Sequence, residues 1–350
     1  MKILVLEGDG IGPEICAATV ACVRELGRGR LGLEFEHAEV GLKSLASRGT
    51  TLPDAVFERA RTAAGIILAP VSTAEYPPRE KGGINPSAEF RTRLELYANM
   101  RPSRVRPALP SIARAMDLVV ARENTEGFYA DRNMFRGSGE FMPTEDVALA
   151  VCKITRRGCR RIAEAAFKLA SRRRKKVTAV HKANVLHLSE GLFEEEVRRA
   201  ASAYPDIAVD DMHVDAACAH VVRSPERFDV IVTTNMFGDI ISNIAAELSG
   251  SMGLAASLNH GDEHAMAQAA HGSAPELAGK DQGNPAGLML STAMLLDWMG
   301  ERHGRRDLVA AGECFAQAIE DVLADPSVRT PDLGGTSGTA AVGEAIAASL

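Results

Sequence analysis

Short apolar runs, each followed by polar residues and then by a helical pattern, recur along the chain. The clearest is Val230–Val232, which has the composition of a buried parallel strand. Similar runs lie at 3–6, 65–69, 118–121 and 177–180. Alternation of strands and helices predicts an α/β fold. In open α/β sheets ligands bind at the carboxyl ends of the strands, so the residues that follow these runs are the first candidates for a functional site.

Asp239 follows the strand at 230–232, at the junction with a helical pattern. Asn243 lies one helical turn later on the same face. A carboxylate in this position can hold a cation or a substrate. It can equally cap the N-terminus of the helix, and the residues alone leave both interpretations open.

Composition excludes several classes of protein. The formal net charge is −6, which argues against a nucleic-acid-binding protein, because such proteins have a basic face. The six cysteines form no C-x-x-C pair. The first residues enter a strand directly, without a signal-peptide pattern, and no run of about 18 apolar residues predicts a membrane span. We therefore expect a reduced, cytoplasmic protein that binds neither nucleic acid nor membrane.

Gly8, Gly10 and Gly12 follow the first strand in a G-x-G-x-G pattern, and Pro13 suits the first turn of a helix. The dinucleotide-binding fingerprint is G-x-G-x-x-G, so the third glycine is misplaced for a Rossmann fold. The pattern predicts a strand–turn–helix with a close backbone approach.

The rest of the chain continues the alternation. Residues 131–144 are rich in Gly, Asn and Arg without periodicity, which is typical of a loop or a protruding arm. The pattern predicts further elements: helices over 88–96, 146–172, 286–303, 307–324 and from 337, and a strand over 206–214 that ends in Asp215.

Three arginines, Arg91, Arg101 and Arg122, are candidates for substrate binding. Arginine binds carboxylates in a bidentate manner, so a cluster of three would suit a di- or tricarboxylate. Surface arginines are common, however, and the sequence alone does not show that these three meet.

Other polar residues suggest acid–base and metal chemistry. A lysine such as Lys182 can act as a general base when its pKa is depressed, and Tyr129 can donate a proton, although a buried structural tyrosine is the default interpretation. Asp215 and Asp239 each follow a strand, and carboxylates with substrate oxygens and water are the ligands of Mg²⁺ or Mn²⁺.

Taken together, these motifs resemble those of the isocitrate/isopropylmalate dehydrogenase family, the metal-dependent β-decarboxylating dehydrogenases. The resemblance spans nearly the whole chain. The motifs are 8–14 (GDGIGPE), 96–102 (LYANMRP), 122–127 (RENTEG), 182–184 (KAN), 235–239 (NMFGD) and 271–275 (HGSAP).

The resemblance implies an α/β, two-domain fold that is not a Rossmann fold. A large NAD-binding domain comprises residues 1–97 and 247–350. A small domain, residues 98–246, binds substrate and metal and mediates dimerisation, with an arm at about 131–144. The family shares its active sites across a homodimer, so we expect a homodimer.

The resemblance also implies a reaction, the oxidative decarboxylation of a 3-substituted (2R)-malate. Hydride passes from C2 to the nicotinamide, and the β-carboxylate is then lost with assistance from Mg²⁺ or Mn²⁺. Lys182 of the partner subunit accepts the hydroxyl proton, and Tyr129 protonates the enol. The residues implied for substrate binding are Asn85, Ser87, Arg91, Arg101, Arg122 and Asn184; those implied for the metal are Asp215, Asp239 and Asn243.

The cofactor is expected to be NAD. NAD enzymes of the family have an acidic residue after the HGSAP motif, and Glu276 stands there. A carboxylate accepts from the ribose 2′-hydroxyl and repels a 2′-phosphate. The residues implied for cofactor binding are Ile11, Ser72, His271, Gly272, Ser273, Ala274, Glu276 and Asn284.

The residues before Arg91 bear on which malate is used. Isopropylmalate enzymes have leucines where this chain has Ser87 and Ala88, and a glutamate at Ile84; homoisocitrate enzymes can have an arginine at Ala88. Isocitrate enzymes have Ser and Asn where this chain has Asn85 and Ser87, the same two residue types exchanged. We expect an isocitrate-like substituent; 3-isopropylmalate is the first alternative, followed by homoisocitrate, tartrate or D-malate.

One position departs from the family pattern. The family usually has a second aspartate one turn after Asp239, and this chain has Asn243. The substitution removes a negative charge, so weaker intrinsic metal binding is expected. Some family members are non-catalytic regulatory subunits, but the retention of Tyr129, Lys182, Asp215 and Asp239 argues against that alternative.

Overall fold

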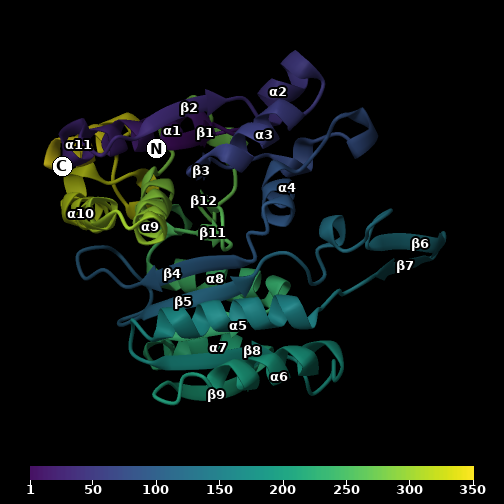
Figure 1. Ribbon diagram of the computed structural model, residues 1–350. Coiled ribbons are helices and arrows are strands. Elements are labelled where there is room, and N and C mark those ends of the chain that lie inside the picture. The colour runs from purple at the N-terminus through teal and green to yellow at the C-terminus, as the bar shows by residue number, and fades with distance from the viewer. The chain divides into compact units, whose positions relative to one another are not determined.

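The protein forms two compact units. The structure, a computed structural model, describes residues 1–350 and all side chains except those of residues 28 and 29. The first unit comprises Met1–Leu94, Arg106–Ser111 and Gly250–Leu350, and the second comprises Glu95–Val105 and Ile112–Ser249. Figure 1 labels most of their helices and strands.

The first unit contains a mixed sheet with the strand order β2-β1-β3-β12-β11. Neighbouring strands are parallel except β11, which is antiparallel to β12. β1 is the buried apolar run that the sequence predicts. The strands are β1 (Lys2–Leu6), β2 (Glu34–Ala38), β3 (Gly65–Leu68), β11 (Leu258–His260) and β12 (Ala265–Ala267).

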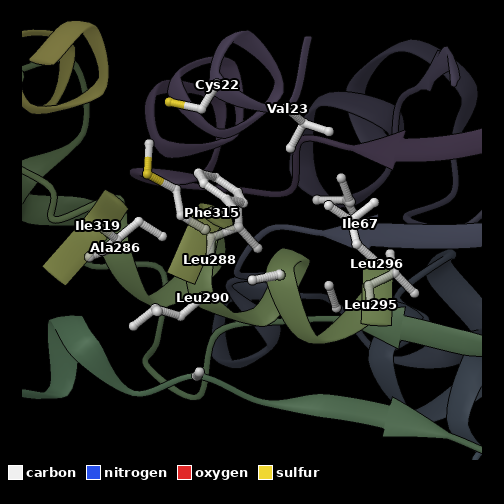
Figure 2. Packing of buried hydrophobic residues seen from close by; sticks show 14 of the residues in the cluster. Cys22, Val23, Ile67, Ala286, Leu288, Leu290, Leu295, Leu296, Phe315 and Ile319 are labelled. Atoms are coloured by element: carbon white, nitrogen blue, oxygen red, sulfur yellow. The ribbon is translucent and has the colours of Figure 1, made fainter. Parts of the chain in front are cut away.

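The core of this unit lies around α9, which is apolar on most of its surface and buried along most of its length. Figure 2 shows side chains of α1, β3, α9 and α10 packed together, among them Cys22, Ile67, Leu288 and Phe315. The helices are α1 (Gly12–Glu25), α2 (Gly41–Arg48), α3 (Asp54–Thr62), α4 (Pro86–Arg93), α9 (Ala286–His303), α10 (Arg306–Leu323) and α11 (Thr339–Ser349).

The second unit contains the strand order β4-β5-β10-β8-β9. β4 is antiparallel to β5, and the other neighbours are parallel. The carboxyl ends of β5, β10, β8 and β9 therefore meet at one edge, where Arg122 pairs with Thr233 and His181 with His213. The strands are β4 (Ala98–Arg104), β5 (Asp117–Glu123), β8 (Lys176–His181), β9 (Ala208–His213) and β10 (Val230–Thr233).

Helices cover both faces of this second sheet. α5 packs with α6, and α7 packs with α8, and both pairs contact the strands (Figure 1). A core of apolar residues, including Leu118, Phe228, Ile231 and Ile241, lies between the strands and α7 and α8. The helices are α5 (Arg156–Ala170), α6 (Ser189–Ala201), α7 (Val214–Arg223) and α8 (Asn235–Ser249).

The segment predicted as a loop or an arm contains the first strand of an exposed hairpin. β6 (Glu140–Thr144) and β7 (Val147–Ala150) are antiparallel, and all their residues are exposed. The hairpin extends away from the helices of its unit (Figure 1). The prediction of a helix from about 146 is wrong for the residues before Arg156. Thr155 caps α5 by accepting a hydrogen bond from the Gly158 backbone N–H at 3.1 Å.

Other boundaries also differ from the predictions. α4 starts at Pro86, earlier than the predicted 88, and ends at Arg93, because Glu95 has a left-handed backbone with φ +52°. β9 ends at His213, so Asp215 lies in the first turn of α7. The helix predicted over 286–303 is confirmed.

Short 3-10 turns connect these elements, at Leu26–Gly29, Thr73–Glu75, Arg79–Lys81, Ala130–Arg132, Pro225–Arg227, Met252–Leu254, Pro275–Leu277, Pro326–Val328 and Pro331–Leu333. Among the helices that the structure describes, none combines the length and the apolar character needed to cross a bilayer.

Candidate active site

Two buried arginines share one carboxylate in the second unit. Arg101 on β4 donates from Nη1 to Asp239 Oδ1 at 3.0 Å, and Arg122 on β5 donates from Nη1 to the same oxygen at 2.6 Å. Arg101 is 6% exposed and Arg122 is 1% exposed. Two guanidinium charges against one carboxylate leave an excess of positive charge at this point of the sheet edge. Such a place suits a further carboxylate from a ligand.

The helix α8 fixes both arginines. Arg122 donates from Nε to the Asn235 backbone oxygen at 2.8 Å and from Nη2 to Asn235 Oδ1 at 2.7 Å. Arg101 donates to Ser242 Oγ at 2.9 Å. Because α8 begins at Asn235, Asp239 lies inside the helix. The interpretation of Asp239 as a helix N-cap is therefore wrong.

Gly238 allows this packing. A Cβ at that position would lie 2.6 Å from Arg122 Cγ and 2.7 Å from Arg122 Cβ. Since real Cβ atoms do not approach other carbons so closely, the stem of Arg122 can lie against α8 only where the helix has a glycine.

Tyr129 completes the cluster. Its hydroxyl donates to Asp239 Oδ2 at 2.8 Å. The guanidinium carbons of Arg122 and Arg132 lie 5.3 Å and 5.0 Å from its ring centroid. Burial raises the pKa of Tyr129; Arg122 opposes this shift and Asp239 reinforces it. The phenol therefore stays protonated and can donate a hydrogen bond or a proton.

Electrostatics at the two arginines follow from burial. Burial, the largest effect, lowers the pKa of Arg101 and of Arg122, and the charge of Asp239 opposes that change at both. Asp239 is therefore the group that compensates two desolvated cations, which makes it more than a surface acid.

Lys182 and Asp215 form a separate pair. Lys182 Nζ donates to Asp215 Oδ1 at 2.6 Å. The hydrogen bond from Lys182 is the main reason that the pKa of the exposed Asp215 is lowered. Because a proton on Lys182 Nζ is used in this hydrogen bond, a role for Lys182 as a base requires that Asp215 be engaged elsewhere. Asn184 is exposed in the turn that follows.

Of the residues implied for the divalent metal, Asn243 has a buried oxygen that is available to such an ion. Asn243 Oδ1 is buried and accepts no hydrogen bond from the described residues. It lies one helical turn after Asp239 on α8. Amide and carboxylate oxygens are ligands that Mg²⁺ or Mn²⁺ accepts. Asp239 would have to exchange one of its contacts with Arg101, Arg122 and Tyr129 for the ion.

Another group of possible metal ligands lies in the same unit. Ligand atoms of His181, Glu194 and Asp211 lie within 4.8 Å of one another, the only such cluster of three among the described residues. His181 Nδ1, however, accepts from the Ala183 backbone N–H at 3.1 Å. Nε2 must then hold the ring proton, so this conformation offers a metal no lone pair from His181.

The glycine motif meets the HGSAP motif in the first unit. The Ile11 backbone N–H donates to the Ser273 backbone oxygen at 2.9 Å, and Ser72 Oγ lies 2.8 Å from Ser273 Oγ. A Cβ on Gly10 would lie 2.0 Å from that Ser273 oxygen. Ala274 has a left-handed backbone with φ +41°, which is rare for a residue with a Cβ. Two loops far apart in sequence are thus held in close contact.

Among the residues around these loops, some have polar atoms available to a bound nucleotide and others are already hydrogen-bonded. His271 Nε2 is buried without a hydrogen-bond partner among the described residues, and burial lowers the pKa of His271. An orphaned buried nitrogen is suited to a ligand group. Asn284 is already engaged, since Oδ1 accepts from the Ala286 N–H and Nδ2 donates to Asp332. Glu276 and Gly272 are exposed.

Asp9 is a functional candidate that sequence reasoning missed. It is 5% exposed, and its carboxylate accepts from the backbone N–H groups of Leu42 and Ser72 and from the Tyr76 hydroxyl. The aspartate of the GDGIG motif therefore ties three segments together at the glycine loop. The sequence feature that could have indicated this role is the position of Asp9 between Gly8 and Gly10.

The predicted substrate residues on α4 have a partner that the sequence did not reveal. Ser87 Oγ donates to Gln268 Oε1 at 2.9 Å, and Arg91 Nη2 donates to the same oxygen at 3.0 Å. Asn85 caps α4 by accepting from the Ala88 N–H at 3.1 Å. Pro86 occupies the first helical turn, where proline is favoured.

Comparisons with known proteins point to one family. The family model described as isocitrate/isopropylmalate dehydrogenase matches residues 2–346. An isocitrate/homoisocitrate dehydrogenase of Thermus thermophilus is 40% identical over 100% of this chain and 98% of the relative. A 3-isopropylmalate dehydrogenase of Methanothermobacter thermautotrophicus is 38% identical over the same shares. The crystal structure of isocitrate dehydrogenase from Methylococcus capsulatus matches with a TM-score of 0.88 at 38% identity, covering 99% of this chain and 98% of that one.

Proposed function

The chain belongs to the isocitrate/isopropylmalate dehydrogenase family, and from this premise we propose that it catalyses the NAD-dependent oxidative decarboxylation of an isocitrate-like 3-substituted (2R)-malate. The fold is the predicted α/β fold of that family and is not a Rossmann fold. The observation that supports the proposal most is the pair of buried arginines, Arg101 and Arg122, that share Asp239.

Arg101 and Arg122 bind substrate carboxylates in this proposal. Both side chains are held by neutral oxygens on α8, from Ser242 and Asn235, so they are oriented before a ligand arrives. Pre-oriented donors lose little freedom on binding. Arg91 supplies a further guanidinium from α4.

Tyr129 and Lys182 move protons. Tyr129 has a raised pKa and an O–H that already donates to a carboxylate oxygen, so it is suited to protonate a carbanion or enol. Lys182 of the partner subunit accepts the hydroxyl proton once Asp215 no longer holds its ammonium group. We propose that the homodimer brings these two residues into one site.

Asp239, Asn243 and Asp215 of the partner subunit would hold Mg²⁺ or Mn²⁺, which supplies positive charge to stabilise oxygen anions of the reacting malate. Because Asn243 is neutral, the protein provides less negative charge to the ion than a third carboxylate would. Metal binding should therefore depend more strongly on the substrate's own carboxylate.

The glycine loop and the HGSAP loop would hold NAD, which accepts the hydride. The buried orphan nitrogen of His271, the Ser72–Ser273 contact and the close approach at Gly10 support this placement. The exposed carboxylate of Glu276 is suited to accept from a ribose 2′-hydroxyl and to repel a 2′-phosphate, so we propose NAD in preference to NADP.

The 3-substituent is proposed to be polar. Arg91 offers a guanidinium to a carboxylate on the substituent, and the segment before it has Asn85 and Ser87 where an aliphatic pocket would need leucines. Relatives of this chain include both isocitrate/homoisocitrate and 3-isopropylmalate dehydrogenases, so the substrates of both are compared in the test below.

A turnover panel tests the proposal. Purified protein is assayed for reduced nicotinamide with Mg²⁺ or Mn²⁺, with NAD or NADP, and with isocitrate, homoisocitrate, 3-isopropylmalate, tartrate or D-malate. We expect metal-dependent turnover, fastest with isocitrate and NAD. Highest kcat/KM with 3-isopropylmalate would overturn the polar substituent, equal rates with NADP would overturn the cofactor assignment, and no turnover of any malate would overturn the reaction.

A further inference from the structure

Gln268 holds two residues of the proposed substrate site through one atom. It follows β12, is 7% exposed and is anchored by its backbone N–H, which donates to the Ser257 oxygen at 3.1 Å. Its Oε1 accepts from Ser87 Oγ and from Arg91 Nη2, at 2.9 Å and 3.0 Å. Because a guanidinium has only donors, the atom that faces Arg91 must be the amide oxygen.

Resting on the function proposed above, we infer that Gln268 is a positioning residue for substrate binding. It aims Arg91 and Ser87 through a neutral oxygen, and this contact cancels none of the arginine's charge.

The oxygen of Gln268 that accepts from Arg91 and Ser87 carries no formal charge. A carboxylate at 268 could accept the same two hydrogen bonds, and charge-assisted bonds are stronger than neutral ones. It would also place a negative charge about 3 Å from Arg91, which would compete with a substrate carboxylate for that guanidinium. An amide therefore orients the arginine and leaves it attractive to an anion.

Ser87 gains a fixed role from the same contact. Its hydroxyl proton is directed to Gln268, so its oxygen lone pairs face away from that bond. Ser87 can then accept a hydrogen bond from a substrate hydroxyl or from water, but it cannot donate to a substrate carboxylate while the contact lasts. Recognition of a γ-carboxylate falls to Arg91.

Two substitutions separate charge from orientation. Gln268→Glu keeps both acceptor positions and adds a charge, whereas Gln268→Met keeps the bulk of the side chain, stays neutral and loses the acceptor. If it matters that residue 268 is uncharged, the KM for isocitrate rises about tenfold or more in Gln268→Glu and rises less in Gln268→Met. A tenfold rise is the loss of affinity typical of losing a charged hydrogen bond. If only orientation matters, Gln268→Glu stays close to wild type and Gln268→Met is the worse variant.

The experiment measures KM and kcat for isocitrate with metal and NAD, the calorimetric dissociation constant of isocitrate with metal, and the melting temperature of each variant. Gln317→Glu on the exposed side of α10 is the charge control and should leave KM, kcat and the dissociation constant unchanged. Because Gln317 donates to Asp321 Oδ1 at 2.8 Å, only its melting temperature should fall slightly. We expect the KM and the dissociation constant to change in parallel, with kcat and melting temperature close to wild type.

Wild-type KM and affinity in Gln268→Glu overturn the role of the uncharged acceptor. Wild-type values in both variants, or a loss that appears only in melting temperature, overturn the positioning role. Failure of the proposed function is distinguishable, because in that case the wild-type protein itself neither turns over nor binds isocitrate.

Discussion

Glu126 illustrates how a single buried acid affects this fold. It is 4% exposed and lies close to Glu123, and burial is the largest of the effects that raise its pKa, to about 7. Its two oxygens accept from the backbone N–H and the hydroxyl of Thr155, at 2.7 Å and 2.9 Å. The residue thus connects the end of β5 to the start of α5, where Thr155 is the N-cap.

The raised pKa predicts a pH-dependent stability. Because the folded state binds the Glu126 proton more tightly than the unfolded chain, the protonated acid stabilises the fold at low pH. That contribution is lost as the pH rises from the ordinary value of 4.5 through about 7. The free energy of unfolding should fall over this window by on the order of 3 kcal/mol at most from this residue.

Replacement of Glu126 by glutamine isolates this contribution. The amide keeps an acceptor for the Thr155 N–H and can donate to the Thr155 hydroxyl. Urea unfolding of wild type and Glu126→Gln at pH 5 and pH 8 should show a clearly smaller loss in the variant. Parallel pH profiles for the two proteins would contradict the prediction.

For individual residues, the sequence predicted which side chains belong to the candidate site but not which of them are in contact. Residue types and spacing identified Arg101, Arg122, Tyr129 and Asp239, and the structure brings these four together. Their mutual geometry was not predictable, because it depends on a pairing between β4, β5 and α8 that no local pattern encodes. For the same reason Gln268, a polar residue after a three-residue strand, could not be predicted as part of the site.

At the scale of elements, α8 shows why one position must be a glycine. Gly238 lies where the helix passes the buried stem of Arg122, whose head is tied to Asn235. The side chain has nowhere to move, since Arg122 is 1% exposed. The close approach of helix and arginine is what places Asp239 within reach of both guanidinium groups.

Gly238→Ala should therefore impair both stability and substrate binding. Overpacking costs roughly 1–3 kcal/mol, which exceeds the gain of up to about 1 kcal/mol from replacing a helical glycine with alanine. Gly191→Ala is the matched control, because Gly191 lies in α6 and a Cβ there meets nothing within 4 Å. We expect a lower melting temperature and a higher KM in Gly238→Ala only. Equal stability of the two variants would refute the steric argument.

Long buried elements were predicted well, and short or exposed ones were not. The helix over 286–303 was predicted at its observed bounds because Pro285 precedes it and Gly304, which has a left-handed backbone, ends it. The strand Val147–Ala150 was mistaken for the start of a helix, since exposed apolar residues in a hairpin have no buried face to set a period of two. β11 and β12, with three residues each, are too short to show any period.

At the scale of the whole molecule, the chain assembles each unit from segments that are far apart in sequence. The first unit combines Met1–Leu94 with Gly250–Leu350, so β3 pairs with β12 across roughly two hundred residues. Strand alternation predicted an α/β class but not this pairing, because the partner of a strand is set by the whole sheet.

The proposed sharing of sites across a homodimer predicts complementation between inactive variants. Tyr129 contacts Asp239, whereas Lys182 is held by Asp215, so the two residues proposed to transfer protons belong to different groups within one chain. Lys182→Met and Tyr129→Phe should each abolish turnover. In a mixed dimer, one site would have Tyr129 from the first chain and Lys182 from the second, both intact. The other site would lack both.

Unfolding and refolding an equal mixture of the two variants should therefore restore about a quarter of wild-type activity, since half the dimers are mixed and each has one intact site. Refolding each variant alone is the control and should restore none. If Lys182 and Tyr129 act within the same chain, every site of every mixed dimer has one defect and the mixture stays inactive. Recovered activity thus reports directly on which chain supplies the base.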